Sequence, residues 1–478
     1  MDRPQHADLP VAVVGAGPVG LAAAARLIER GLTPLIFERG AQAGATIADW
    51  AHVRVFSPWE FNTDAAARAL LEAEGWHMPA PDHLPTGAEL IRDYLAPLAA
   101  HPAIAPHLRL NAEVEAIARH DHSKLSSEGR DAVPFVIVWR DAQGARHRTL
   151  ARAVIDASGT WVRPNPIGRD GLPVEGEVEN AARIAYGIPD VRGAARADYA
   201  GRHTLVIGAG HSAINAALDL IALAGEAPGT RVSWATRSGG IERLLGGGLN
   251  DALPGRGALG LRAAEALRDG RAALLSPFTA RRIAAQGDGL EVAGEVGGVD
   301  TVLEVDRIVV ATGFRPDLAM LSELRLALDP VVEATPALAP LIDPNLHSCG
   351  TVRPHGVVEL SHPEKDFFIV GMKSYGRAPT FLMTTGYEQV RSVVADLAGD
   401  LVAAREVRLK LPETGVCQSG PALSAAERGL AGIAESGCCG GPPKVEPAAC
   451  CARDEAARAV GRTGCGCGSE AEPESLAK

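Results

Sequence analysis

Apolar residues at the start of the chain alternate between strand and helix patterns. Residues 9–14 (LPVAVV) form a run of the length that a buried parallel strand needs, and residues 33–37 form a second such run. Between them, residues 19–30 carry apolar side chains at helical spacing, and the pattern stops at Gly31. The pattern predicts a strand, a helix and a second parallel strand, which is the beginning of an α/β fold.

A glycine pattern, GxGxxG, separates the first predicted strand from its helix. Gly15 suits the tight turn, Gly17 lets a pyrophosphate approach the backbone, and Gly20 lets the helix pack close to the strand. Glu38 closes the second strand about 20 residues later, where its carboxylate can accept hydrogen bonds from a ribose, and Arg39 follows it. Together these features predict an adenine dinucleotide site.

A second unit of the same kind begins near the middle of the chain. Its first strand is predicted at 204–207, and its helix begins at Ser212. The glycine pattern between them reads GxGxxA and consists of Gly208, Gly210 and Ala213. Two such units in one chain predict one tightly held dinucleotide and one exchanging coenzyme.

The residue that follows the second strand of this unit indicates the coenzyme. The run 231–235 predicts that strand, and Arg237 stands where an NAD site would place an acid. A guanidinium can pair two phosphate oxygens at once, so Arg237 favours the 2′-phosphate of NADPH over NADH. A surface Arg in an NADH site is the alternative.

Further elements are expected along the rest of the chain. Thr86 and Glu89 have the spacing of a capping box, which predicts a helix over 86–99. The run 303–317 predicts another buried strand, closed by Thr312 and Gly313. Shorter strands are predicted at 108–110, 133–139 and 153–155, a helix from about Thr384, and a strand or helix end at 401–411.

These motifs resemble those of the two-dinucleotide-fold flavoproteins, which include disulfide reductases and class B flavin monooxygenases. The matching stretches are 15–20 (GAGPVG) with Glu38, 208–213 (GAGHSA) and 311–317 (ATGFRPD). The resemblance implies an α/β fold with two Rossmann-like domains that bind FAD and NADPH. The implied limits are 1–165 and 311–411 for the FAD domain, 166–310 for the inserted NADPH domain and 412–478 for a flexible Cys-rich tail.

Cysteine positions separate the two branches of these flavoproteins. Disulfide reductases of this architecture need a redox Cys pair beside the flavin, and residues 40–55 and 201–310 contain no Cys. Reduced flavin is therefore expected to pass its electrons to O₂, as in the monooxygenases. Two stretches depart from the class B pattern, because 186–190 (YGIPD) lacks the fingerprint His and 367–373 (FFIVGMK) lacks the late Asp.

Residues 343–388 are expected to close the FAD site. The implied cofactor contacts are Gly371, Thr380 and Thr384, and the N-terminus of the helix near Thr384 would stabilise reduced flavin. Lys373 and Arg377 could add to that positive field. The segment also contains His347, Cys349, His355 and His362. Each His is either a hydrogen-bonded loop residue or a catalytic one, and the Cys349 thiol could engage a soft substrate atom.

The stretch 49–62 (DWAHVRVFSPWEFN) mixes large aromatic residues with a few polar ones. It is either an aromatic-rich packing segment or a pocket wall beside a planar ring, in which polar groups provide orientation. Under the second interpretation Arg54, Ser57 and Trp59 are catalytic-site candidates.

The tail carries six candidate ligands for a thiophilic ion. Residues 412–478 are rich in Gly, Pro, Ala and Glu, so the tail is expected to be disordered. Zinc or an inert extension are the alternatives, although CxxC spacing and His are absent from the tail. The candidate ligands are Cys438, Cys439, Cys450, Cys451, Cys465 and Cys467.

Composition excludes some classes of partner. The net charge of −11 is spread along the chain, which argues against nucleic acid. No apolar run reaches the about 18 residues of a membrane span, and residues 1–8 show no leader pattern, so a cytoplasmic protein is expected. A small-molecule substrate and O₂ are the expected partners, and a homodimer stays open.

The flavin fold and the Cys-rich tail together resemble the flavoprotein monooxygenases of arsenic-resistance operons. The resemblance implies oxidation of a trivalent arsenical, such as methylarsenite, to the pentavalent form by a flavin hydroperoxide. An oxygenase of a sulfur or nitrogen compound and a non-enzymatic, thiol-based arsenic or metal carrier are the alternatives. The matching positions are Trp50, Val53, Arg54, Phe56, Ser57, Pro58 and Trp59.

Overall fold

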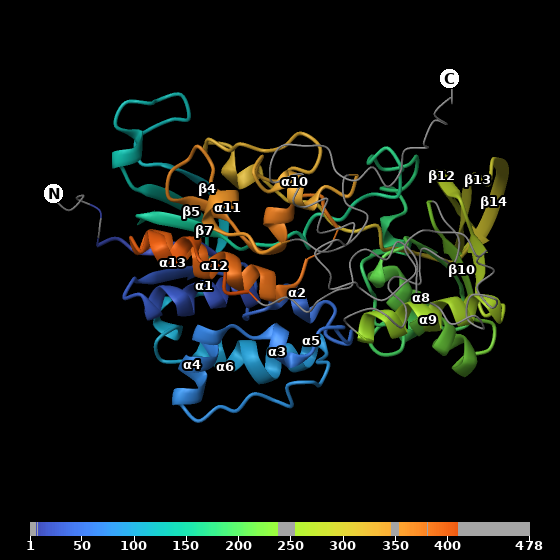
Figure 1. The fold of residues 1–478 in the computed structure, drawn as a ribbon. Helices are drawn as coiled ribbons and strands as arrows, with labels where there is room; N and C mark the ends of the chain where they lie inside the picture. Colours follow the sequence, from blue (N-terminus) through green and yellow to red (C-terminus); the bar gives the residue numbers. More distant parts are fainter. Residues whose placement is uncertain (1–5, 7, 238–253, 346–352, 380, 410–478) are drawn as a thin grey trace, which may run out of the picture.

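The structure is a computed structural model that describes residues 6, 8–237, 254–345, 353–379 and 381–409 (Figure 1). The predicted tail at 412–478, with its six candidate ligands, lies outside the described residues, as do His347, Cys349 and Thr380. The described residues form two α/β units that lie side by side in Figure 1, and each unit contains a five-stranded parallel sheet.

The first sheet has the strand order β16-β7-β1-β2-β3. Because β16 comes from near the end of the described chain, this unit is assembled from two distant parts of the sequence. Helices α1 (Pro18–Glu29) and α12 (Met383–Leu397) pack against each other beside the sheet (Figure 1). The strands are β1 (Val11–Val14), β2 (Pro34–Phe37), β3 (Leu108–Arg109), β7 (Ala153–Asp156) and β16 (Phe367–Ile369).

The helix predicted at 86–99 is present but contains a π-helical turn. It consists of α5 (Gly87–Leu90), the π turn Ile91–Leu95 and α6 (Ala96–Ala100), and Thr86 and Glu89 form the predicted capping box. Pro97 has no N–H for the Asp93 carbonyl four residues earlier. The Trp76 indole N–H donates to that carbonyl instead, at 2.7 Å. A side chain from outside the helix therefore satisfies the group that proline leaves open.

The second unit repeats the parallel arrangement, with strand order β11-β10-β9-β15-β8. Helices α8 (His211–Glu226) and α9 (Pro254–Arg268) pack against each other in this unit. The strands are β8 (Ile184–Tyr186), β9 (His203–Ile207), β10 (Arg231–Ala235), β11 (Ala273–Leu275) and β15 (Arg307–Val310). The predicted fold class, α/β with two Rossmann-like units, is confirmed for the described residues.

Each unit also has a three-stranded antiparallel sheet. The strands are β4 (Glu113–Arg119), β5 (Phe135–Arg140) and β6 (Arg146–Ala151) in the first unit, and β12 (Phe278–Gln286), β13 (Gly289–Val296) and β14 (Val299–Val305) in the second. The remaining helices are α2 (Ala45–Ala48), α3 (Trp59–Asn62), α4 (Ala65–Ala73), α7 (Arg196–Tyr199), α10 (Ala339–Ile342), α11 (Val357–Leu360) and α13 (Leu401–Arg405).

The single strand predicted from residue 303 is wrong, because the chain changes sheet at Asp306. β14 ends the antiparallel sheet at Val305, and β15 begins the parallel one at Arg307. The Asp306 N–H donates to the His203 carbonyl at 2.8 Å, and its carboxylate accepts the His203 N–H at 2.7 Å. These two bonds fix the corner between the sheets.

A buried ion-pair network ties the returning segment to the antiparallel sheet of the first unit. The Glu364 carboxylate lies 2.7 Å from Arg119 Nε and 2.7 Å from Arg130 Nη2, and all three residues are buried. The Arg325 N–H also donates to Glu364, at 2.9 Å. Burial alone would raise the pKa of the Glu364 carboxyl, but hydrogen bonds from Arg130 and Arg119 outweigh burial and the pKa lies below its ordinary value.

Glu364→Gln should lower the free energy of unfolding by about 3–5 kcal/mol, because two buried guanidinium groups lose their anionic partner. Because folding lowers the pKa of Glu364, its full contribution to stability is present above the ordinary Glu pKa of about 4.3. That contribution is lost as the pH falls through the lower pKa of the folded state. Urea unfolding at pH 7 and in steps below pH 4 measures both effects. The exposed Glu323→Gln should change stability by less than about 0.5 kcal/mol; equal losses in the two variants contradict the assignment.

Candidate functional site

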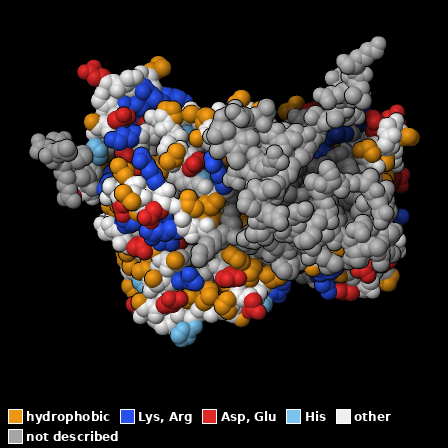
Figure 2. All heavy atoms as spheres, in the orientation of Figure 1, with side chains coloured by type: hydrophobic (Ala, Val, Ile, Leu, Met, Phe, Trp, Pro, Cys, Tyr) orange, Lys and Arg blue, Asp and Glu red, His pale blue; other side chains and the backbone are white. Residues whose placement is uncertain are grey.

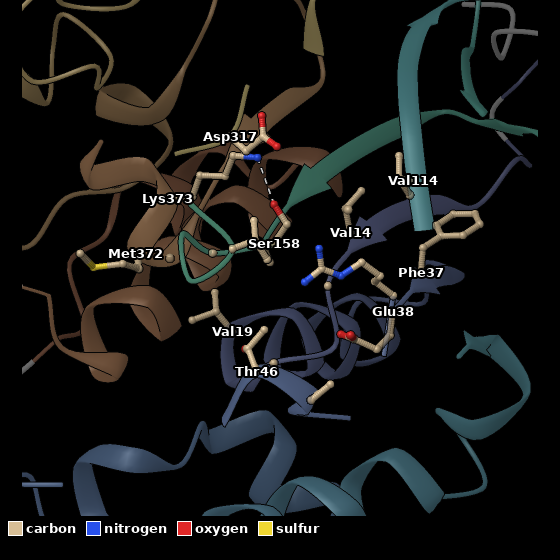
Figure 3. A pocket seen from close by; sticks show the side chains of 18 of the residues that line it. Val14, Val19, Phe37, Glu38, Thr46, Val114, Ser158, Asp317, Met372 and Lys373 are labelled. Atoms are coloured by element: carbon tan, nitrogen blue, oxygen red, sulfur yellow. Dashed lines mark hydrogen bonds between the residues drawn. The ribbon is translucent and has the colours of Figure 1, made fainter. Parts of the chain in front are cut away.

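A cavity of about 400 Å³ opens beside the carboxyl ends of the strands in the first sheet (Figure 3). Ligands of open α/β sheets bind at this edge, where the loops after the strands converge. The loops after β1, β2, β7 and β16 all line the cavity, together with the first residue of α12. The two distant parts of the sequence that form the sheet therefore also form its site.

The glycines of the first motif have different surroundings. A Cβ added at Gly15, which has φ +99°, would lie 2.8 Å from the Ala157 carbonyl oxygen. One added at Gly20 would lie 2.0 Å from the Gly15 carbonyl oxygen. At Gly17 an added Cβ meets nothing within 4 Å, although this residue lines the cavity. The protein itself requires the outer glycines, whereas the middle one faces space that a ligand can fill.

The second motif has the same geometry. Gly208, with φ +144°, would place a Cβ 2.3 Å from the Ala311 carbonyl oxygen, and Gly210 has nothing within 4 Å. α8 begins directly after Gly210, with Ser212 half-buried and Ala213 buried in its first turn. The first N–H groups of α8 thus face the space beside Gly210, where a phosphate would be favourably placed.

The Glu38 carboxylate is held by the backbone on both sides. Its Oε2 accepts the Ala16 N–H at 2.7 Å, and its Oε1 accepts the Gly40 N–H at 2.7 Å. A carboxylate has about four lone-pair positions, so oxygens oriented in this way can still accept from a ribose. Glu38 and the exposed Arg39 both line the cavity.

The loop after β16 lines the opposite side of the cavity. Gly371 has φ +69° and donates its N–H to Gln389 Oε1 at 2.7 Å. Lys373 is buried and lies 2.7 Å from Asp156 Oδ2. Thr384 is half-buried in the first turn of α12 and follows Met383, which lines the cavity. Of the two predicted cations, Lys373 lines the cavity, whereas Arg377 pairs with Glu333 at 2.8 Å.

The two described histidines of this segment do not line the cavity. His355 Nδ1 lies 3.1 Å from the Arg353 carbonyl oxygen, and its Nε2 lies 2.8 Å from Gln389 Nε2. Burial lowers the pKa of His355, and it lowers the pKa of His362 to about 4. Both side chains are buried against aromatic rings, Tyr375 and Phe367 respectively, which fits the interpretation of hydrogen-bonded loop residues.

The predicted catalytic candidates of the segment 49–62 do not line the cavity. Trp59 and Ser57 are buried, and Ser57 Oγ donates to Asn62 Oδ1 at 2.8 Å. Arg54 is exposed, donates to the Leu84 carbonyl and lies 3.7 Å from a Glu89 oxygen. Trp50 of this segment lines the cavity instead. The geometry of these residues favours the packing interpretation for Ser57 and Trp59.

Part of this segment contacts the second unit. Val53 packs against the hydrophobic core of that unit, and the Phe56 ring lies 4.9 Å from the ring of His211, the first residue of α8. The residue pattern of the segment did not indicate this role. Val53 and Phe56, which are three residues apart, supply these contacts, and that spacing was the available signal.

The remaining predicted coenzyme contacts lie at the edges of the second sheet. Arg237 is exposed and follows β10 at the same sheet edge as Gly208 and Gly210. Thr312 Oγ1 donates to the Asn165 carbonyl at 2.9 Å, and the Asn165 N–H donates to the Gly313 carbonyl at 2.9 Å. Asn165 belongs to the chain connection that leads from β7 to β8, and Thr312 and Gly313 belong to the one that leaves β15. These hydrogen bonds thus link the two chain connections between the units.

Three further observations concern the surface charges, metal ligands and membrane-spanning helices of the described residues. On the face shown in Figure 2, basic and acidic side chains of the described residues are intermixed. Among the described ranges, no group of three His, Cys, Asp or Glu side chains could hold a metal ion. No helix in those ranges is long and apolar enough to span a membrane.

Comparisons with known proteins agree with this architecture. The family profile described as NAD(P)-binding Rossmann-like domain matches residues 13–78. The thiamine thiazole synthases of Pyrobaculum calidifontis and Pyrobaculum aerophilum are each 30% identical over 213 residues, which is 39% of this chain and 76% of theirs.

Three solved structures share the fold over 82% of this chain. The bacillithiol disulfide reductase of Bacillus cereus has 18% identity and a TM-score of 0.62, with 99% of that chain covered. The ornithine hydroxylase of Pseudomonas aeruginosa has 16% identity and a TM-score of 0.55, with 99% covered. A flavin monooxygenase variant from Stenotrophomonas maltophilia has 21% identity and a TM-score of 0.52, with 98% covered. The Rossmann-like profile and this two-domain fold support FAD and NAD(P)H as cofactors.

The open space at each middle glycine generates a paired test. Gly17→Ala should weaken the dinucleotide of the first unit by about tenfold or more and leave that of the second unit unchanged; Gly210→Ala should do the reverse. Both variants should keep the melting temperature of the unliganded protein within about 3 °C of wild type, because no protein atom is displaced. Binding titrations and thermal unfolding measure the two effects. Gly20→Ala is the control that should destabilise the fold, and equal binding in all variants contradicts the site assignment.

Proposed function

Since the chain belongs to the Rossmann-fold nucleotide-binding family that includes the thiamine thiazole synthases, and is built as a two-dinucleotide-binding flavoprotein, we propose that it is an FAD- and NADPH-dependent monooxygenase. The observation that carries the proposal is the cavity of the first unit, which combines an open Gly17 and an oriented Glu38 with a lining in which no described residue is Cys. In this proposal FAD occupies that cavity and NADPH the site beside Gly210.

The lack of thiols supports the oxygenase branch over the reductase branch. The fold is shared with a disulfide reductase and with flavin monooxygenases alike, so fold similarity does not separate them. Residues 1–348 contain no Cys, and all eight cysteines follow. A dithiol beside the first cavity therefore has no source in the sequence that precedes Cys349. Electrons that reach the flavin go to O₂ in this proposal.

The domain limits are part of the proposal. An FAD domain at 1–165 and 311–411 with an NADPH domain at 166–310 is supported by the sheets, because β15 ends at Val310 in the second sheet and β16 belongs to the first. Arg54, Ser57 and Trp59 are proposed to support the wall that carries Trp50, without touching the reacting atoms.

In the proposed function, each group of residues at the site has a separate role. Bound FAD would accept two electrons from NADPH and deliver one oxygen atom of O₂ to the substrate, while the other oxygen leaves as water. The N-terminus of α1 and Gly17 would hold the pyrophosphate, and Glu38 would hold the ribose. Trp50, Phe381 and Met383 line the cavity with apolar surface, which would exclude water from the flavin end.

A trivalent arsenical is the proposed substrate. Its lone pair is the nucleophile, so the transfer of oxygen needs no general base from the protein. Three of the five methionines, Met320, Met372 and Met383, line the cavity. Thioether sulfur is soft and polarizable, which suits a soft arsenic centre better than a hard, charged substrate. The resemblance of residues 50–59 to the arsenic-resistance monooxygenases supports the same substrate.

Purified protein should be yellow and should oxidise NADPH faster when methylarsenite is added, with one pentavalent arsenical formed per NADPH. Spectrophotometry at the NADPH band, combined with arsenic speciation, measures the coupling. A thioether and an amine, tested in parallel, are the comparison substrates. NADPH oxidation that ignores the arsenical and yields peroxide alone contradicts the proposal, and protein without bound FAD would indicate a carrier instead.

Arg237→Ala should raise the KM for NADPH by about 10- to 150-fold and leave the KM for NADH unchanged, because a charge-assisted contact to the 2′-phosphate is lost. Steady-state kinetics with both coenzymes measure the effect. Arg231 is exposed at the opposite end of the same strand, so Arg231→Ala is the matched control. An unchanged preference for NADPH in Arg237→Ala would contradict the assignment of Arg237 to the 2′-phosphate.

A further inference from the structure

A buried ion pair lies beneath the wall of the first cavity. Lys373 Nζ is 2.7 Å from Asp156 Oδ2, and the two side chains are 1% and 0% exposed. Ser158 Oγ donates to Asp156 Oδ1 at 2.6 Å and accepts from Lys373 Nζ at 3.0 Å (Figure 3). The three residues join the loop after β7 to the loop after β16.

The pair is asymmetric with respect to the cavity. Lys373 and Ser158 line the cavity, whereas Asp156 does not. Asp156 Oδ2 accepts no hydrogen bond among the described residues, so the ammonium of Lys373 is its compensation. The positive end of the pair therefore faces the cavity and the negative end faces the sheet. Charges in such a dry environment act more strongly on a neighbouring ligand than charges in water.

The position of the pair selects the part of the dinucleotide that it affects. Figure 3 shows Lys373 and Glu38 on opposite sides of the cavity. Glu38 belongs to the ribose of the adenosine half, so the opposite side belongs to the flavin half in the proposed function. Among the described lining residues the positive charges are Arg39, beside Glu38, and Lys373. Lys373 is thus the cation on the flavin side.

We propose that the Lys373–Asp156 pair sets the reduction potential of the bound flavin, with Lys373 stabilising reduced flavin and Asp156 limiting that effect. Two-electron reduction makes the flavin more negative when it takes up a single proton. A nearby ammonium favours that product, and a carboxylate behind the ammonium weakens its field. Lys373 and Asp156 are positioning residues for charge, and neither exchanges a proton. The inference rests on the proposed binding of FAD in this cavity.

The reduction potential of the FAD-loaded protein should change in opposite directions in two single variants. Lys373→Met should lower it, and Asp156→Asn should raise it, each by at least the equivalent of a tenfold change in the reduction equilibrium, about 30 mV for a two-electron couple. The double variant should lie between wild type and Lys373→Met, because the nearer charge of the pair dominates. The exposed Lys365→Met, which does not line the cavity, is the control and should match wild type.

The measurement is photoreduction against a reference dye, without NADPH or substrate, with FAD content read from absorbance. A purely structural role would shift both single variants in the same direction or neither, and either result overturns the proposal. Removing one partner of a buried pair can prevent folding. In that case the wild type and the double variant still decide, because equal potentials contradict the inference. Wild type that binds no FAD refutes the proposed function instead, so the two failures are distinguishable.

Discussion

Both glycine turns depend on a close contact between backbone and backbone. The turn after the first strand of each unit presses against the loop after a neighbouring strand, so that an added Cβ would lie 2.8 Å from the Ala157 oxygen at Gly15 and 2.3 Å from the Ala311 oxygen at Gly208. Side-chain rearrangement cannot relieve such a contact. It therefore holds each turn over the carboxyl edge of its sheet and aims the N-terminus of the following helix at the site.

Charges near the first cavity are compensated before any ligand binds. Two backbone N–H groups orient Glu38, and Asp156 balances Lys373. Farther from the cavity, two guanidinium groups hold Glu364 and anchor the segment that leads into β16. Because Lys373 lies in the 3-10 helical turn Gly371–Tyr375 that directly follows β16, the anchored segment also helps to fix where that ammonium lies. The structural ion pairs and the site are thus parts of one arrangement rather than separate features.

Sequence patterns predicted those features of the fold that depend on residues close together in the sequence. The glycine turns and their flanking strands were predictable because positive φ and close backbone approach restrict residue type at Gly15 and Gly208. The strand change at Asp306 was not, because it depends on the hydrogen bond between Asp306 and His203, which are 103 positions apart. The contact between Lys373 and Ser158 joins residues 215 positions apart, which no local pattern records. The available signal was the Lys itself, in the stretch 367–373 that lacks the late Asp of the class B pattern.

The segment 49–62, which the sequence left as either a packing segment or a pocket wall, contacts both units. Trp50 lines the first cavity, Val53 packs into the core of the second unit, and Phe56 meets His211 at the start of α8. Burial raises the pKa of Asp219 on α8. Hydride transfer between two dinucleotides requires a defined orientation of their domains. In the proposed function, the contacts of Trp50, Val53 and Phe56 with the first cavity and the second unit would help to set that orientation.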